Sequence, residues 1–256
     1  MDVNTEYLGQ LINGLAYLVV GLGLARLAFR SRQRPERLLG IYFVFTAFDY
    51  LFYAVPRVFM FDAVVEVADL VARSSYAIAV ASLVIFTREV FRRADVWARA
   101  LMWLCIAGVG VGVVGALAFG QGVYPAPSEF FFWPYYLGYT VACLWVATEA
   151  LLAHSNARKR LAIGLCEPAV VNRYLLWGAF GALQVMACGV LLVVYHQEAT
   201  QGAVSRWTDL LLSATEVSSV AMLWLAFFPP AFYTRWVGSS NGLNGSNAET
   251  ETSERS

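Results

Sequence analysis

The chain has 256 residues, of which 59% are hydrophobic and only 14% are charged. A soluble domain of this length carries roughly a quarter charged residues, so the composition excludes an ordinary soluble globule and predicts an integral membrane protein. The net charge is zero, and this balance gives no support for nucleic-acid binding.

Seven apolar stretches follow one another along the chain. A helix needs about 20 apolar residues to cross a bilayer, and each stretch is close to this length. Together they leave no room for a soluble domain. We therefore expect an all-α membrane protein, a seven-transmembrane helix bundle over residues 1–237, followed by a tail over 238–256 whose Gly, Ser, Asn and Glu content predicts disorder. The expected spans are 7–29, 38–55, 63–86, 100–119, 130–152, 174–195 and 207–228.

Basic residues gather in alternate gaps between these spans. All of them are arginines except Lys159. Three gaps hold several basic residues each, whereas the intervening gaps hold Arg57, none and Arg206. Short basic loops stay in the cytoplasm, so we expect the N-terminus outside and the C-terminus in the cytoplasm. The preference for Arg over Lys favours a bacterial source, and hence the bacterial inner membrane. The basic gaps are 30–37, 88–99 and 158–173.

Glycines distinguish the fourth span. Gly108 and Gly112 have the four-residue spacing at which two helix backbones approach closely. This face predicts tight packing against another helix of the same chain. The alternative is a homodimer that forms through Gly108 and Gly112.

Four polar side chains are predicted to lie near the middle of the membrane. A charge in hydrocarbon costs several kcal/mol on insertion scales, so such residues should face the bundle interior or a water-filled cavity. At about 1.5 Å per residue, these side chains reach similar depths on four different spans. They are Asp49, Arg73, Gln184 and Glu216.

Two polar stripes extend this pattern. Residues spaced three and four apart share one face of a helix. In the third span the stripe comprises Asp62, Glu66, Asp69, Arg73 and Tyr76. In the seventh span it comprises Asp209, Ser213, Glu216 and Ser219.

These stripes predict a funnel that opens outward and ends at the midplane. Arg73 can pair there with Asp49 or Glu216, but one arginine does not neutralise all the carboxylates. A proton, a cation or an amine ligand could fill the remaining place. The alternative is that these groups only clamp helices together through buried hydrogen bonds. The candidate ligand or proton cavity is Asp49, Glu66, Asp69, Arg73, Gln184 and Glu216.

Two further charged residues near span ends are expected to have local roles. Arg26 can extend its guanidinium to the cytoplasmic surface. Glu149, one turn from the inner end of the fifth span, is expected to meet Arg158 or Arg160.

The loop before the sixth span contains a helix-starting pattern that a simple connection between two spans would not need. Glu167 and Pro168 predict the start of a short helix, which could lie on the inner membrane surface. We expect partner docking on this side of the membrane. The candidate docking residues are Arg88, Glu167 and Arg173.

The sequence lacks the residues that several known membrane-protein chemistries require. The topology resembles that of microbial rhodopsins, which attach retinal to a lysine in the seventh span, but Lys159 lies in a loop. His154 and His196 are expected at opposite membrane faces and cannot share a metal ion. The sequence contains no CxxC, HExxH or GxSxG motif. No cofactor or metal is therefore predicted, and the sequence leans away from an enzyme without deciding the question.

The pattern favours a heptahelical sensor or receptor-like module that signals to a separate cytoplasmic protein. The second interpretation is a small solute or proton transporter that uses the midplane polar cluster. A third is a membrane enzyme acting on lipids through Asp49, Glu66 or Glu216. A fourth is a structural subunit of a larger complex.

Overall fold

Seven helices make up the fold in the part of the chain that the structure describes. The computed structural model describes residues 3–59, 61, 64–119, 129–202, 204–230 and 232–233. The predicted tail over 238–256 therefore lies outside the described residues. The helices are α1 (Val3–Ser31), α2 (Arg34–Val58), α3 (Val65–Phe91), α4 (Val96–Ala118), α5 (Phe132–Ala162), α6 (Pro168–Gln201) and α7 (Arg206–Phe227).

All seven helices are long and apolar enough to cross a membrane, which confirms the number of spans expected from the sequence. Many large apolar side chains also lie on the surface of the bundle, such as Trp103, Leu104 and Val114 on α4. A soluble protein rarely exposes apolar patches of this extent, but lipid tails cover them at no cost. Both observations fit an integral membrane protein.

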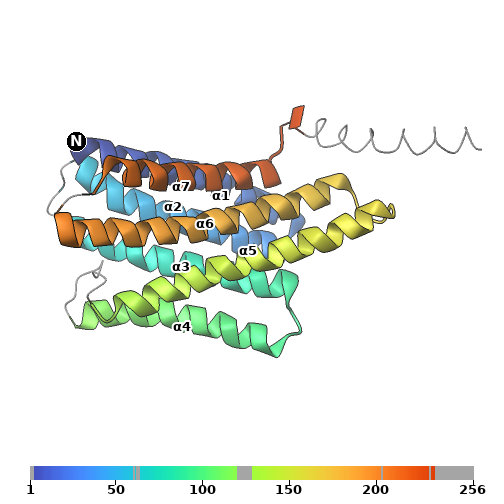
Figure 1. Cartoon of the computed structure of the whole chain (residues 1–256), viewed down its shortest axis with the longest axis horizontal. Helices are drawn as coiled ribbons and strands as arrows, with labels where there is room; N and C mark the ends of the chain where they lie inside the picture. The colour runs from blue at the N-terminus through green and yellow to red at the C-terminus, as the bar shows by residue number, and fades with distance from the viewer. Residues whose placement is uncertain are drawn as a thin grey trace, which may run out of the picture.

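The helices run up and down in the order of the sequence. Each helix packs against the next one, α7 returns to contact α1, and α3 also contacts α5. Because α3 and α5 touch directly, α4 lies outside the ring that the other six helices form (Figure 1). The start of α1 and the end of α7 consequently lie at opposite ends of the bundle.

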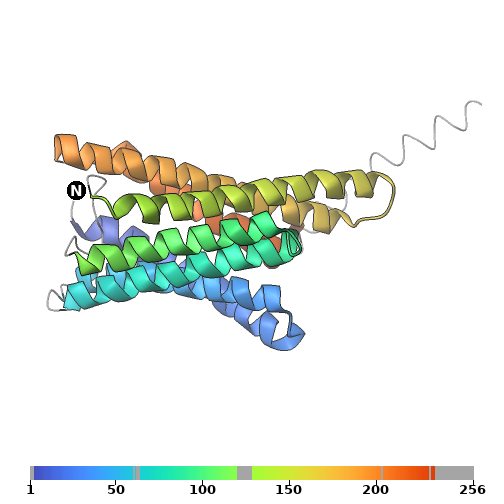
Figure 2. The same cartoon turned by 90° about the horizontal axis from the view of Figure 1, so that it is seen from below.

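Helices α5 and α6 are longer than the apolar spans predicted for them. They contain 31 and 34 residues, and their hairpin projects beyond the other helices at the end where the basic gaps lie (Figures 1 and 2). The residues expected to form a separate surface helix are instead the first turns of α6. Pro168 fits there because the first turn of a helix needs no intrahelical amide donor, and no helix breaker separates it from the following span.

The packed core lies where six helices meet. Its largest fully buried side chains include Tyr17, Phe43, Phe180 and Leu223, which come from α1, α2, α6 and α7. A second cluster holds α4 against α3 and α5 around Val80, Cys105, Val109 and Trp145. Helix α4 is thus attached through one side only, and its remaining surface is left for lipid.

The glycines of α4 face α5 of the same chain. A Cβ added to Gly108 would lie 2.8 Å from the main-chain oxygen of Pro134, and one added to Gly112 would lie 2.9 Å from the backbone of Tyr135. Across the seam, a Cβ on Gly138 would lie 3.0 Å from the main-chain oxygen of Cys105. The close approach that the spacing predicted therefore occurs within the chain, between α4 and α5.

The α4–α5 seam makes a testable prediction about stability. We expect Gly112→Ala to destabilise the protein by roughly 1–3 kcal/mol because the added methyl group forces the two backbones apart. Thermal unfolding of the purified protein in detergent measures this change.

The matched control is Gly110→Ala on the same helix, where nothing lies within 4 Å of the added Cβ. Alanine favours a helix over glycine by up to about 1 kcal/mol, so this variant should be as stable as the wild type or more so. Equal melting temperatures for the two variants would show that the seam is not tightly packed.

Candidate functional site

A half-buried carboxylate on α7 is held by polar groups from two other helices. The Asn13 amide on α1 donates a hydrogen bond of 2.7 Å to Glu216 Oε2, and the Tyr50 hydroxyl on α2 also hydrogen-bonds to this carboxylate. Within the described ranges, no arginine or lysine forms an ion pair with Glu216. Neutral donors therefore satisfy this group, which was predicted to face the bundle interior.

A second set of hydrogen bonds meets at Gln184 on α6. Its amide nitrogen donates to Ser219 Oγ at 2.8 Å and to the Tyr17 hydroxyl at 3.2 Å. Its amide oxygen accepts a bond of 2.5 Å from the Tyr139 hydroxyl on α5. Ser219 is fully buried and donates to the main-chain oxygen of Glu216 at 2.7 Å. The amide nitrogen and the amide oxygen of Gln184 thus both have hydrogen-bond partners.

The two sets form one cluster, which we name the central network. Ser219 links them through the backbone of Glu216, and the ring of Tyr17 stacks on that of Tyr50 with 5.6 Å between the centroids. The cluster joins five of the seven helices near the middle of the bundle. Its members are Asn13, Tyr17, Tyr50, Tyr139, Gln184, Glu216 and Ser219.

Asp69 lies on α3 one helical turn before Arg73 and pairs with an arginine near the end of α2. It accepts two parallel hydrogen bonds from Arg57, at 2.7 and 2.8 Å. The guanidinium also lies over the ring of Tyr53, 3.9 Å from its centroid. Asp69 was predicted to line the outward funnel, one helical turn from Arg73, and the structure pairs it with Arg57, a residue that the prediction did not include.

Arg73 is buried on α3 and lies over an aromatic ring of α5. Its guanidinium carbon is 3.8 Å from the centroid of the Tyr135 ring. Asp49, half-buried on α2, lies within electrostatic reach of Arg73, and also of Glu216 and Asp69. Asp49 and Arg73 thus lie in one neighbourhood together with Tyr135, which was not among the predicted cavity residues.

The two predicted stripes do not form one buried set. Glu66 and Ser213 are exposed on their helices, whereas Ser219 is buried. Asp62 and the side chain of Asp209, which were to form the acidic mouth of the funnel, lie outside the described residues. Of the six predicted cavity residues, Gln184 and Glu216 belong to the central network, and Arg73 lies over Tyr135 within electrostatic reach of Asp49. Asp69 pairs with Arg57, and Glu66 is exposed.

A third polar cluster lies at the basic end of the bundle. Arg92, just after α3, donates to both oxygens of Glu149 on α5 at 2.8 and 3.0 Å, and Trp145 donates to the same carboxylate. Hydrogen bonding to Glu149 raises the pKa of the Arg92 guanidinium. The expected partners of Glu149 are wrong, since Arg158 and Arg160 are exposed more than two helical turns further along α5.

The predicted docking residues all lie at this basic end. Glu167 and Arg173 are exposed at and after the start of α6. Arg88 is half-buried, donates to the main-chain oxygen of Arg93 at 3.1 Å, and has its Nε buried without a hydrogen-bond partner. Nearby, Asn172 and Tyr233 exchange two hydrogen bonds of 2.9 and 3.2 Å, which fasten the chain after α7 to α6.

Sequence reasoning missed four members of the central network, which are Asn13 and the three tyrosines. Asn13 offered the clearest signal, because it is an amide in the middle of an otherwise apolar span. The tyrosines gave none, since aromatic residues occur throughout the chain. Among the described residues, no group of three or more His, Cys, Asp or Glu side chains could hold a metal ion.

No family model, curated protein or solved structure matches the chain. The arrangement of its own residues therefore carries the argument about function.

The Arg57–Asp69 pair makes a prediction that distinguishes buried from exposed ion pairs. Their side chains are 17% and 12% exposed, and removing one partner leaves the other charge buried and unpaired. We expect Arg57→Ala to lower the free energy of unfolding by about 3 kcal/mol, measured by denaturation in detergent micelles.

The control is Arg34→Ala, which breaks the pair between Arg34 and Glu89 at the opposite end. There the arginine side chain is 74% exposed, so the free energy of unfolding should fall by less than about 1 kcal/mol. Equal losses in the two variants would contradict a structural role for the Arg57–Asp69 pair.

Proposed function

We propose that this protein is a heptahelical membrane sensor or receptor-like module that signals to a separate cytoplasmic partner. The proposed setting is a bacterial inner membrane, with the N-terminus outside and the basic end in the cytoplasm, because short basic loops stay on that side. One observation carries the proposal. The two helices that meet at Gln184 and Tyr139 in the central network also form the hairpin that projects beyond the bundle at the basic end.

The length of these helices supports a mechanical link. From Tyr139, α5 continues without a break to Ala162. A helical segment of this length measures about 35 Å. From Gln184, α6 runs back to its start at Pro168 over more than four turns. Continuous helices carry a displacement along their length, so a shift at the Tyr139–Gln184 hydrogen bond would move the hairpin tip.

The hairpin tip has the composition of a docking surface. Helix α5 is about 46 Å long, whereas the hydrocarbon core is about 30 Å thick. Its last turns therefore extend into water. There the tip exposes Arg158, Lys159 and Arg160 together with Ile163 and Leu165. Basic residues beside exposed apolar ones favour an acidic protein partner with an apolar patch.

The trigger in this proposal is a change at Glu216. Its carboxylate accepts hydrogen bonds from Asn13 and Tyr50, so proton uptake or the binding of an amine or cation would alter both bonds. Those bonds connect α7 to α1 and α2, and Ser219 connects the same turn of α7 to Gln184. A change at one carboxylate thereby reaches the helices that form the hairpin.

A distance measurement tests this mechanism. Spin labels at Ser155→Cys and Ala100→Cys, both exposed at the basic end, report the separation of the hairpin from α4 by pulsed electron resonance. Cys166 is replaced by Ser because it is the cysteine that is partly exposed. We expect Glu216→Gln, which removes the charge but keeps the shape, to change the mean distance by on the order of 2 Å or more.

The matched control is Glu66→Gln, the same chemical change at an exposed position on α3, which should leave the distance distribution as in the wild type. Identical distributions for wild type and Glu216→Gln, in a protein that elutes and melts normally, would overturn the proposed link.

A small solute or proton transporter is the second candidate. The observation that favours it is the position of Glu216, a carboxylate near mid-membrane that accepts bonds from neutral donors and that no described arginine neutralises by an ion pair. Groups of this kind serve as proton relays in membrane proteins.

Flux in liposomes separates the two candidates. The transporter predicts that vesicles containing the protein dissipate an imposed pH gradient, that Glu216→Gln abolishes this flux, and that Glu66→Gln does not. The sensor predicts the same slow leak for all three proteins and for empty vesicles, measured with an entrapped pH-sensitive dye.

A further inference from the structure

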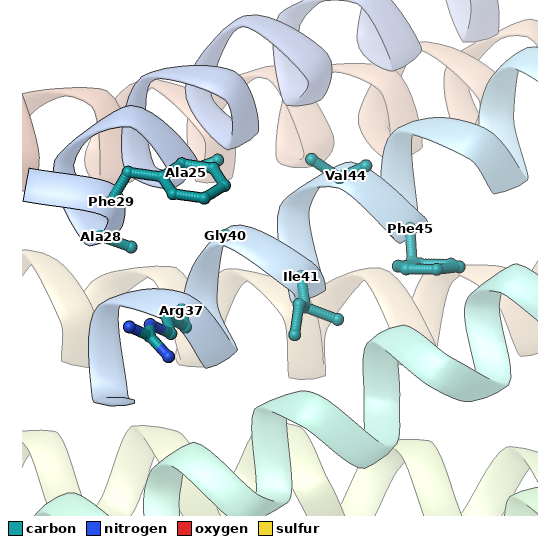
Figure 3. A pocket seen from close by; sticks show the side chains of 8 residues that line it. All are labelled: Ala25, Ala28, Phe29, Arg37, Gly40, Ile41, Val44 and Phe45. Carbon is teal, nitrogen blue, oxygen red and sulfur yellow. The ribbon is translucent and has the colours of Figure 1, made fainter. Parts of the chain in front are cut away.

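A groove runs between α1 and α2 near the basic end of the bundle, away from the central network. It has a volume of about 400 Å³ and is lined on one side by residues of α1 and on the other by residues of α2 (Figure 3). Arg37 and Phe29 lie at one end of it and Phe45 at the other. Apart from Arg37, all the residues that line it are apolar.

Small side chains leave this space open. Ala25 and Ala28 line the α1 side, and Gly40 lines the α2 side. The two backbones are close at this level, since a Cβ on Gly40 would lie 3.3 Å from the backbone nitrogen of Ala25. The bulky side chains of Phe29 and Ile41 are exposed beside it. The groove is therefore a channel on the membrane-facing surface and not a gap within the core.

The depth of the lining residues matches the layers of a bilayer. Arg37 lies in the first turn of α2, three residues after its start. Phe45 lies about 12 Å deeper along the same helix. One end of the groove thus lies at the level of lipid headgroups and the other within the hydrocarbon.

The charge at the shallow end is unbalanced. Residues 26–37 contain five arginines and one acidic residue, Glu36. Glu36 accepts a hydrogen bond from Ser31, and Arg34 pairs with Glu89 at 3.2 Å. Arg37 is exposed, and none of the ion pairs between described residues includes it. Among the described residues no carboxylate pairs with its positive charge, so an anionic headgroup can approach it.

We propose that this groove binds one anionic phospholipid of the leaflet at the basic end, with an acyl chain along α1 and α2 and the phosphate on Arg37. A guanidinium binds a phosphate through two parallel hydrogen bonds, and the negative charge of the cytoplasmic leaflet favours basic residues at its surface. The small residues supply the space for the chain, and Arg37 supplies the selectivity for an anionic headgroup. This proposal rests on the proposed orientation, with the basic end in the cytoplasm, and does not depend on whether the protein is a sensor or a transporter.

Native mass spectrometry of the full-length protein in detergent tests the proposal, with added phosphatidylglycerol as probe and phosphatidylcholine as the neutral comparison. We expect the wild type to retain phosphatidylglycerol preferentially. Arg37→Ala should weaken its retention on the order of fivefold, and Arg37→Lys should keep most of the preference. Arg99→Ala removes an equal charge from an exposed position on α4 at the same end and should leave the retention of both lipids unchanged.

A second pair of variants tests the apolar part of the groove. Ile41→Trp fills the groove from an exposed position and should lower retention of both lipids, whereas Leu104→Trp, on the exposed face of α4, should not. Equal retention by Arg37→Ala and Arg99→Ala would overturn the proposal, as would equal retention by the two tryptophan variants. Binding of inorganic phosphate that competes with phosphatidylglycerol and survives Ile41→Trp would overturn the acyl-chain part and leave a simple anion site.

Discussion

The structure depends on one constraint, which is that hydrocarbon offers no water to satisfy a polar group. Each polar side chain at mid-depth must find its partner inside the bundle or be costly to keep there. The Gln184 amide shows the consequence most clearly, since it donates to Ser219 and Tyr17 and accepts from Tyr139. One side chain thereby joins α1, α5, α6 and α7, and these helices cannot rotate independently without breaking a bond that only the protein supplies.

Polar contacts occur at three levels along the bundle, and each joins a different set of helices. Arg57 and Asp69 tie α2 to α3 at one end, the central network joins five helices in the middle, and Arg92 binds Glu149 of α5 at the basic end. Apolar, close-packed contacts also hold the helices together, as in the glycine seam between α4 and α5. Tyr139 and Gln184 of the middle level lie on α5 and α6, the two helices of the projecting hairpin.

The outer surface has its own chemistry. Helix α4 is held from one side, and α1 and α2 leave a groove whose shallow end carries Arg37. The surface that faces lipid therefore contains a charged group, Arg37, in addition to apolar side chains. A bound anionic lipid would add contacts to the α1–α2 hairpin at the end where the helices enter water. That role is physically separate from the hydrogen bonds around Gln184 and Glu216.

The sequence by itself determined the seven spans, because a stretch of about 20 apolar residues is long enough to cross a bilayer whatever surrounds it. It also determined that Gln184 and Glu216 lie midway along their helices and that Gly112 belongs to a close-packing face, because position along a helix follows from residue number. The partners were decided only by the tertiary structure. Asn13 and Glu216 are 203 positions apart, and no periodicity in one helix indicates which face of another will meet it. The same reason explains why Arg57 was not foreseen as the partner of Asp69.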